Sequence, residues 1–216
     1  MNGFKKQFGF TLVETIVVVG IIVLLASMMV GIATRIESQG KERLARATLA
    51  ILNTALEQFK DYNYKYRHQN FDGLVFPLDC NGFDIADVES TLVDAMDLTT
   101  GEVEITLFDE ANHDANDFGC EVMYLFLNRV AECRVTLDRL DSSAVLVSGT
   151  VNITRDSKDH DYPLLRIVDP WGTTLKYDYY DESSSLPDPD FKRVFPVVTS
   201  AGPDGEFDTG DDISNR

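Results

Sequence analysis

A long apolar stretch near the start of the chain is the clearest feature of its hydrophobic pattern. Thr15 to Thr34 are twenty consecutive residues without a charged side chain. A helix of that length, at about 1.5 Å per residue, spans roughly 30 Å, the thickness of a bilayer core. Residues 17–25 leave such a helix no polar face, which is typical of a segment surrounded by lipid or by an assembly. The pattern predicts a transmembrane or filament-core helix over residues 10–34.

The charges that flank this stretch predict its orientation. Lys5 and Lys6 precede it and Arg35 follows it, so the bias of positive residues toward the cytoplasm places the N-terminus there. A cleaved signal peptide is an alternative, but its apolar region has about 7–15 residues and ends in a small-residue cleavage site. The stretch here is longer, and no clear site follows it. An uncleaved signal anchor is a second alternative.

Residues 35–68 change to an amphipathic pattern. Apolar side chains recur there at steps of three and four residues, the spacing of one helix face. They include Leu44, Ile51, Leu52, Ala55, Leu56, Phe59, Tyr62 and Tyr66. We therefore predict one helix from about residue 11 to 66, weakest at Gly40, whose second half lays its apolar stripe on a sheet.

Residues 69–216 form the body, a predicted globular domain. Alternating patterns and turn residues predict five strands and two shorter helices. The strands fall at 102–108, 134–140, 144–154, 164–168 and 174–180, and the helices at 92–96 and 120–130. The expected fold class is α+β, with one long helix packed on a mostly antiparallel sheet.

Charge separates the two parts of the chain. The formal net charge of −17 divides into +4 over residues 1–68 and −21 over residues 69–216. An acidic body repels phosphates, so nucleic acid is not an expected partner. The same charge suits a divalent cation or a basic partner, and it equally suits a plain solvated surface.

The cysteines and histidines form no recognisable catalytic or metal-binding motif. Three cysteines, Cys80, Cys120 and Cys133, allow one disulfide with one thiol left over, or three buried free thiols. The motifs of common hydrolases, zinc enzymes and nucleotide-binding proteins are absent from the sequence. We interpret His113 and His160 as loop residues, and we expect no enzyme activity.

The residues just before the apolar stretch carry a specific signal. The sequence Gly9-Phe10-Thr11-Leu12-Val13-Glu14 resembles the site at which prepilin peptidase cleaves type IV pilins and type II secretion pseudopilins. The resemblance implies that residues 1–9 are a leader peptide, that cleavage falls between Gly9 and Phe10, and that the new amine of Phe10 is methylated. It also implies that Glu14 pairs with the N-terminal amine of a neighbouring subunit during assembly. An acidic side chain within a membrane segment costs about 2.5–3.5 kcal/mol at its centre, which marks Glu14 as functional unless it snorkels to the interface.

The chain ends in an acidic loop. Four Asp and one Glu lie between Asp204 and Asp212, separated by glycines. Carboxylates at that density repel one another unless a cation gathers them, and Ca²⁺ takes six to eight oxygen ligands in flexible geometry. A disordered acidic tail is the alternative.

A second resemblance bears on this loop. Asp169-Pro170-Trp171-Gly172, then residues 200–205 and 210–213, look like the C-terminal half of the major pseudopilin of type II secretion, where such a loop binds calcium. It implies Asp204 and Asp212 as side-chain ligands, Asp208 and Asp211 as further ones, and a carbonyl near Ser200.

Together these resemblances imply a structural subunit of a type II secretion pseudopilus. It would be held in the inner membrane by a single span, with a periplasmic body, and would polymerise with sister pseudopilins after processing by prepilin peptidase. The secretion assembly platform of the inner membrane would be a further partner. A type IV pilus or minor pilin subunit is one alternative, and a membrane-anchored periplasmic binding module that never polymerises is another.

Overall fold

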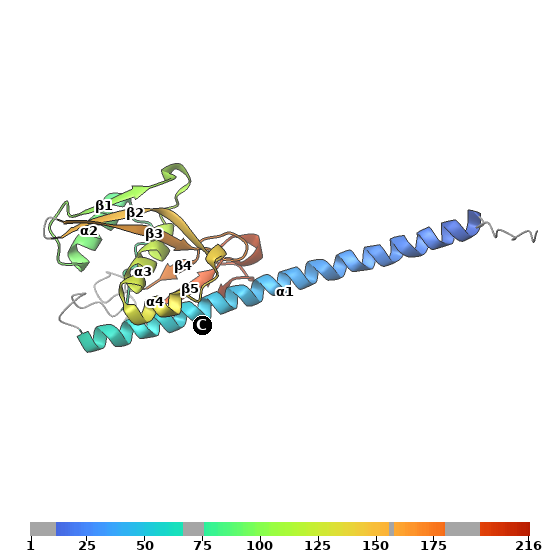
Figure 1. The fold of residues 1–216 in the computed structure, drawn as a ribbon, viewed down its shortest axis with the longest axis horizontal. Helices are drawn as coiled ribbons and strands as arrows, with labels where there is room; N and C mark the ends of the chain where they lie inside the picture. Colours follow the sequence, from blue (N-terminus) through green and yellow to red (C-terminus); the bar gives the residue numbers. More distant parts are fainter. Residues whose placement is uncertain (1–11, 67–75, 156–157, 180–194) are drawn as a thin grey trace, which may run out of the picture. The chain divides into compact units, whose positions relative to one another are not determined.

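A single long helix opens the fold. The computed structural model describes residues 12–66, 76–155, 158–179 and 195–216, without the side chains of 28–35, 63–66 and 112. Helix α1 runs over Leu12–Tyr66, a length of 55 residues (Figure 1). It continues through Gly40 without a break, so the single helix predicted from the apolar pattern is confirmed.

The chain divides into two compact units between Lys41 and Glu42. The first unit contains the N-terminal part of α1, and the second contains the rest of α1 and the whole body. Within the described residues, no helix meets the length and hydropathy that a membrane span requires. The predicted apolar stretch reaches into residues 28–34, whose side chains lie outside the description.

The described residues of the second unit also form two antiparallel sheets and the helices α2, α3 and α4, so the α+β class is confirmed. The first sheet has the strand order β1-β2-β3, and the second has the order β4-β5-β6. The elements are α2 (Ile85–Ala95), β1 (Val103–Leu107), η1 (Glu110–Asn112), α3 (Asp117–Arg129), α4 (Ala131–Leu137), η2 (Ser142–Ala144), β2 (Val145–Arg155), β3 (Lys158–Ile167), β4 (Lys176–Asp178), β5 (Val197–Ser200), η4 (Gly202–Asp204) and β6 (Ile213–Ser214).

Strand β1 and the second half of β2 alternate buried and more exposed side chains, as the sequence predicted. Ile105 of β1 lies opposite Val151 of β2, and both side chains are buried. The pairing of β2 with β3 shifts between Val147 and Gly149, which marks a bulge. A Cβ atom at Gly149 would clash with the carbonyl oxygen of Thr106, so only glycine fits there.

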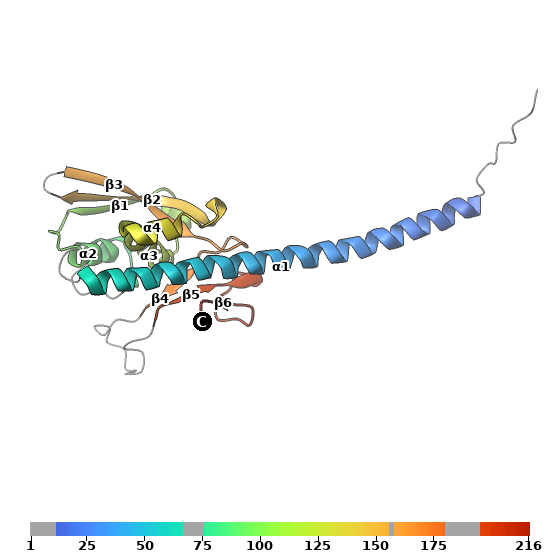
Figure 2. The ribbon, with the colours of Figure 1, turned by 60° about the horizontal axis from the view of Figure 1, so that its bottom comes forward.

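The second half of α1 supplies one wall of the core. Its buried stripe consists of Ala45, Leu49, Leu52, Ala55, Leu56 and Phe59. Phe59 packs edge-on against Phe126 of α3, with ring centroids 6.5 Å apart. The thiol of Cys133 lies 3.2 Å from the carbonyl oxygen of Ala55, so this part of α1 also contacts α4. The stripe therefore packs on α3 and α4, which lie along this part of α1 in Figure 2, whereas the sequence predicted a sheet there.

Segment 134–140 was predicted as a strand, and this was wrong. Ala131–Leu137 is helix α4, which buries Cys133, Thr136 and Leu137 at helical spacing. The β-branched pair Val135-Thr136 favoured a strand, but packing against α1 overrides that weak local preference. The hydroxyl of Thr136 donates a 2.8 Å hydrogen bond to Oε1 of Gln58, which ties α4 to α1.

The remaining element predictions hold with shifted bounds. The strands expected at 102–108 and 144–154 are β1 and β2, and the helix expected at 120–130 is α3. Helix α2 begins seven residues before the predicted 92–96 because the Asp84 side chain accepts a hydrogen bond from the amide of Asp87 and caps it. Strand β3 begins earlier than the predicted 164–168, and β4 covers only part of 174–180.

Candidate functional site

The N-terminal processing site can be placed only in part. Gly9 and Phe10 lie outside the described residues, so cleavage and methylation there stay predictions. Glu14 lies in the first turn of α1 and is exposed in the single chain. It stands among apolar neighbours, as the sequence predicted.

The apolar side chains around Glu14 are exposed to solvent in the single chain. Leu12 has 79% of its surface exposed, and the residues that follow remain about half exposed. They are Val13, Ile16, Val17, Val18, Val19, Ile21, Ile22, Val23, Leu24 and Leu25. So large a contiguous apolar surface marks an interaction site with protein or membrane.

The C-terminal acidic loop is an ordered hairpin connection. Ser200 pairs with Ile213 in the β5-β6 ladder, so residues 201–212 form a closed loop. The carboxylate of Asp169, 4% exposed, accepts hydrogen bonds from the amides of Trp171 and Thr173 and from the Ser200 hydroxyl. The structure therefore joins the Asp-Pro-Trp-Gly turn directly to the first residue of the loop region. The disordered-tail alternative is wrong for these residues.

Carboxylates of the loop hold its backbone in shape. Oδ2 of Asp211 accepts from the amide of Asp204 at 3.2 Å, and Oδ1 accepts from the Thr209 hydroxyl at 2.6 Å. The Thr209 bond in particular lowers the pKa of Asp211. Oδ2 of Asp212 accepts from the amide of Asp208 at 2.8 Å, while Asp208 adopts a φ of 66°. The turn at Gly202 has a φ of 71°, and a Cβ atom there would clash with the Asp211 carbonyl.

The acidic loop offers one carboxylate oxygen to a metal ion, but it does not gather a full set of side-chain ligands. Among the described residues, no three His, Cys, Asp or Glu side chains form a group that could hold a metal. The predicted ligands Asp204, Asp208, Asp211 and Asp212 share one loop without making such a group. Oδ1 of Asp212 is nevertheless buried and has no hydrogen-bond partner in the described part of the chain. A buried carboxylate oxygen without a donor fits a cation that is bound otherwise by main-chain carbonyls.

A buried polar cluster was missed from the sequence. The Nε2 atom of His113 lies 3.0 Å from Oε2 of Glu121, and their side chains are 6% and 0% exposed. Asp117 and Arg166 form a second ion pair beside them. Burial lowers the pKa of His113, but the hydrogen bond and charge of Glu121 outweigh it, and the pKa is raised. His113 lies between η1 and α3, so its interpretation as a loop residue is confirmed, but the sequence did not predict that its side chain pairs with Glu121.

Two further assignments from the sequence can now be decided. His160 lies within β3 rather than in a loop, because the strand extends back to Lys158. Cys80, Cys120 and Cys133 are all free thiols, each fully buried. Burial raises the pKa of each thiol to about 12, so they are packing residues rather than nucleophiles.

Comparison with known proteins identifies the start of the chain. Residues 4–30 match the family described as the prokaryotic N-terminal methylation motif, which is typical of type IV pilin-like proteins and pseudopilins. The matched range includes Gly9, Phe10 and Glu14. No curated protein and no solved structure matches the chain significantly.

Proposed function

We propose that this chain is a pilin-like structural subunit that polymerises through α1. The observation that carries the proposal is the methylation motif at residues 4–30, set at the start of a helix whose apolar side chains are exposed in the single chain. Proteins with this motif are processed by prepilin peptidase and assemble as structural subunits. A structural role, rather than an enzymatic one, is therefore the function we assign.

The energetics of α1 support assembly. Each large apolar side chain gains about 1.5–3 kcal/mol when it is moved from water into lipid or protein. The exposed residues of Leu12–Leu25 thus require a bilayer before assembly and neighbouring helices after it. The uncharged run from Thr15 to Thr34 supports an inner-membrane span with the body in the periplasm.

Glu14 has a defined task in this proposal. Cleavage after Gly9 would create a positive amine at Phe10, four residues from Glu14. Inside a bundle of apolar helices, the amine of one subunit and the Glu14 carboxylate of the next would neutralise each other. Either charge alone would be costly to bury there.

Within the pilin-like proteins, we propose that the chain is a subunit of a type II secretion pseudopilus. Its partner would then be the secretion platform of the inner membrane. The support is the link between the Asp169 turn and the closing loop, both of which resemble the major pseudopilin. A type IV pilus or minor pilin subunit is the second candidate, favoured equally by the methylation motif. Production beside the components of each machine, with secretion and surface fibres as separate readouts, distinguishes the two.

Calcium is a proposed cofactor of the closing loop. Asp212 and Asp204 would hold it, with Asp208 and Asp211 contributing charge, and it would supply a cross-link between the two ends of the loop. The support is the buried Oδ1 of Asp212, which has no hydrogen-bond donor among the described residues. A cation that binds only the folded loop would stabilise the body by mass action.

The test of the main proposal is intact mass followed by assembly. The full chain is produced with prepilin peptidase, and we expect loss of residues 1–9 and addition of one methyl group. The variant Glu14→Ala should be processed normally but fail to form filaments, whereas Glu57→Ala, an exposed change later in α1, should form them. Retention of residues 1–9, or normal filaments from Glu14→Ala, would contradict the proposal.

A further inference from the structure

An open pocket lies on the body, and His113 is the one lining residue that it shares with the candidate functional groups described above. Its volume is about 390 Å³, at the small end of the range for ligand pockets of about 300–1,000 Å³. Its lining consists of Phe83, Asp84, Ile85, Ala86, Leu107, Glu110, His113, Ala115 and Phe118. The pocket lies where the start of α2, the end of β1, the short helix η1 and the start of α3 meet.

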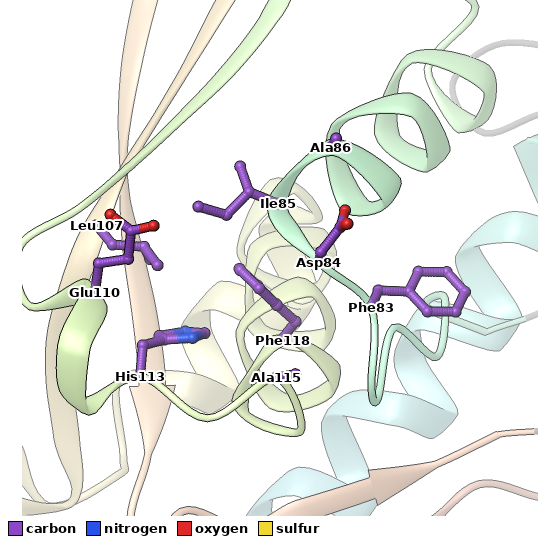
Figure 3. Close-up of a pocket in the computed structure, with 9 residues that line it drawn as sticks. All are labelled: Phe83, Asp84, Ile85, Ala86, Leu107, Glu110, His113, Ala115 and Phe118. Carbon is purple, nitrogen blue, oxygen red and sulfur yellow. The ribbon is translucent and has the colours of Figure 1, made fainter.

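The side chains give the pocket an apolar floor and an acidic edge. Ile85 and Phe118 point into the space from one side, and Leu107, Glu110 and His113 border it from the other (Figure 3). The Glu110 carboxylate is exposed and makes no hydrogen bond or ion pair within the part of the chain that the structure describes. It is thus an available charge beside an apolar surface.

The sequence segment that lines the pocket is strongly acidic. Residues 68–128, which contain all nine lining residues, hold 14 Asp and Glu but no Lys or Arg. Arg166 of β3 is close enough to His113 to affect its charge, but it already forms an ion pair with Asp117. The potential of this region therefore favours a positive ligand.

An anion is disfavoured at the same place. The N-terminus of α2 would attract one, but the Asp84 carboxylate already occupies that position by accepting from the amide of Asp87 at 2.8 Å. A second anion would meet both Asp84 and Glu110. The ligand that fits has an apolar stem and a positive end, as a lysine or arginine side chain does.

We propose that this pocket is a docking site for a lysine or arginine side chain of a partner protein. The aliphatic stem of that side chain lies on Ile85, Leu107 and Phe118, and Glu110 meets its charge. The site stands on the geometry of the body alone, so it is independent of whether the chain polymerises.

The experiment uses the full chain in micelles of a zwitterionic detergent, followed by amide NMR. The probe is the peptide acetyl-Gly-Ala-Lys-Ala-Gly-amide, compared with peptides carrying norleucine or glutamate in place of lysine. We expect the lysine peptide to shift the resonances of Ile85, His113 and Phe118. The norleucine peptide should bind roughly 1.5-fold to fivefold more weakly, the range expected for one exposed ion pair.

Two matched variants test whether Glu110 is the carboxylate that binds the lysine ammonium group. Glu110→Gln should weaken the binding of the lysine peptide by a similar factor. Glu104→Gln changes an exposed carboxylate on β1 in the same acidic segment and should leave that binding unchanged. Equal binding of the lysine and norleucine peptides would overturn the proposal, and that comparison needs no variant. Preference for the glutamate peptide, or shifts confined to residues 201–212, would overturn it as well.

Discussion

The hydroxyl of Ser200 donates a 2.7 Å hydrogen bond to Oδ2 of Asp169, and both residues are buried. Their positions in the chain differ by 31 residues. Because the other oxygen of Asp169 accepts two amides of its own turn, this single carboxylate fixes the turn and the start of the closing loop together.

Ser200→Ala should lower the free energy of unfolding by about 1–3 kcal/mol, because a buried carboxylate oxygen loses its donor. Ser214→Ala, the same chemical change on the adjacent strand β6, is the control and should cost much less. Urea unfolding followed by the fluorescence of Trp171, the single tryptophan, measures both. Equal losses for the two variants would show that the Asp169 bond adds nothing.

Gly202→Ala should destabilise the closing loop. The backbone there has a φ of 71°, and the new Cβ atom would clash with the Asp211 carbonyl. We expect a loss of about 1–3 kcal/mol in the free energy of unfolding, the cost of a non-glycine residue in that region. Gly210→Ala, in the same loop with open space around it, should change the stability by less than about 0.5 kcal/mol. A harmless Gly202→Ala would mean that the loop can shift to accept it.

Calcium should raise the melting temperature of the body by roughly 5–10 °C when present at a hundred times its dissociation constant. Asp212→Asn should abolish this rise, because it alters the carboxylate whose buried oxygen has no donor among the described residues. Asp138→Asn, an exposed change at the end of α4, should leave the rise intact. An unchanged melting temperature with calcium would remove the cofactor from the proposal without touching the polymerisation proposal.

Stability should depend on the protonation of His113. Burial lowers the pKa of this histidine in the folded state and Arg166 adds to that effect, but Glu121 and Asp117 together outweigh them, so the pKa is raised. A raised pKa means that the folded state holds the proton more tightly than the unfolded state. The resulting stability is therefore fully present below the unfolded pKa of about 6.5 and is lost as the pH rises through the folded pKa.

The variant His113→Gln tests this linkage. The free energy of unfolding of the parent protein should fall as the pH rises from 6 to 9, and His113→Gln should lack most of that fall. His160→Gln, an exposed histidine on β3, should keep the fall of the parent protein. An identical pH profile for His113→Gln and the parent would show that another group titrates.

Much of the fold could be predicted because its signals are local. The helix α1 follows from apolar residues repeated at helical spacing, and β1 and β2 follow from alternation. The error at Arg134–Leu140 has the same origin, since seven residues carry too little periodicity to outweigh a β-branched pair. Only burial against Ala55 and Gln58 of α1 decides that segment as helix.

The candidate sites also differ in whether their residues are close in the sequence. Gly9, Phe10 and Glu14 lie within six consecutive residues, so the motif that they form is readable without a structure and falls in the range that the family comparison matches. The pairing of His113 with Glu121 and Arg166 with Asp117 could not be foreseen. The Arg166–Asp117 pair depends on where β3 and α3 meet, and the His113–Glu121 pair depends on how the loop before α3 folds back on that helix.

The sequence by itself determined that the chain starts with an apolar helix bearing one acid near its start, because helical periodicity and charge are properties of neighbouring residues. The tertiary structure decided which distant groups share a site: Asp169 with Ser200, and the acidic edge of Glu110 with the apolar floor of Ile85 and Phe118. These contacts form only when sheets and helices close on a common core, so their energies depend on the whole fold.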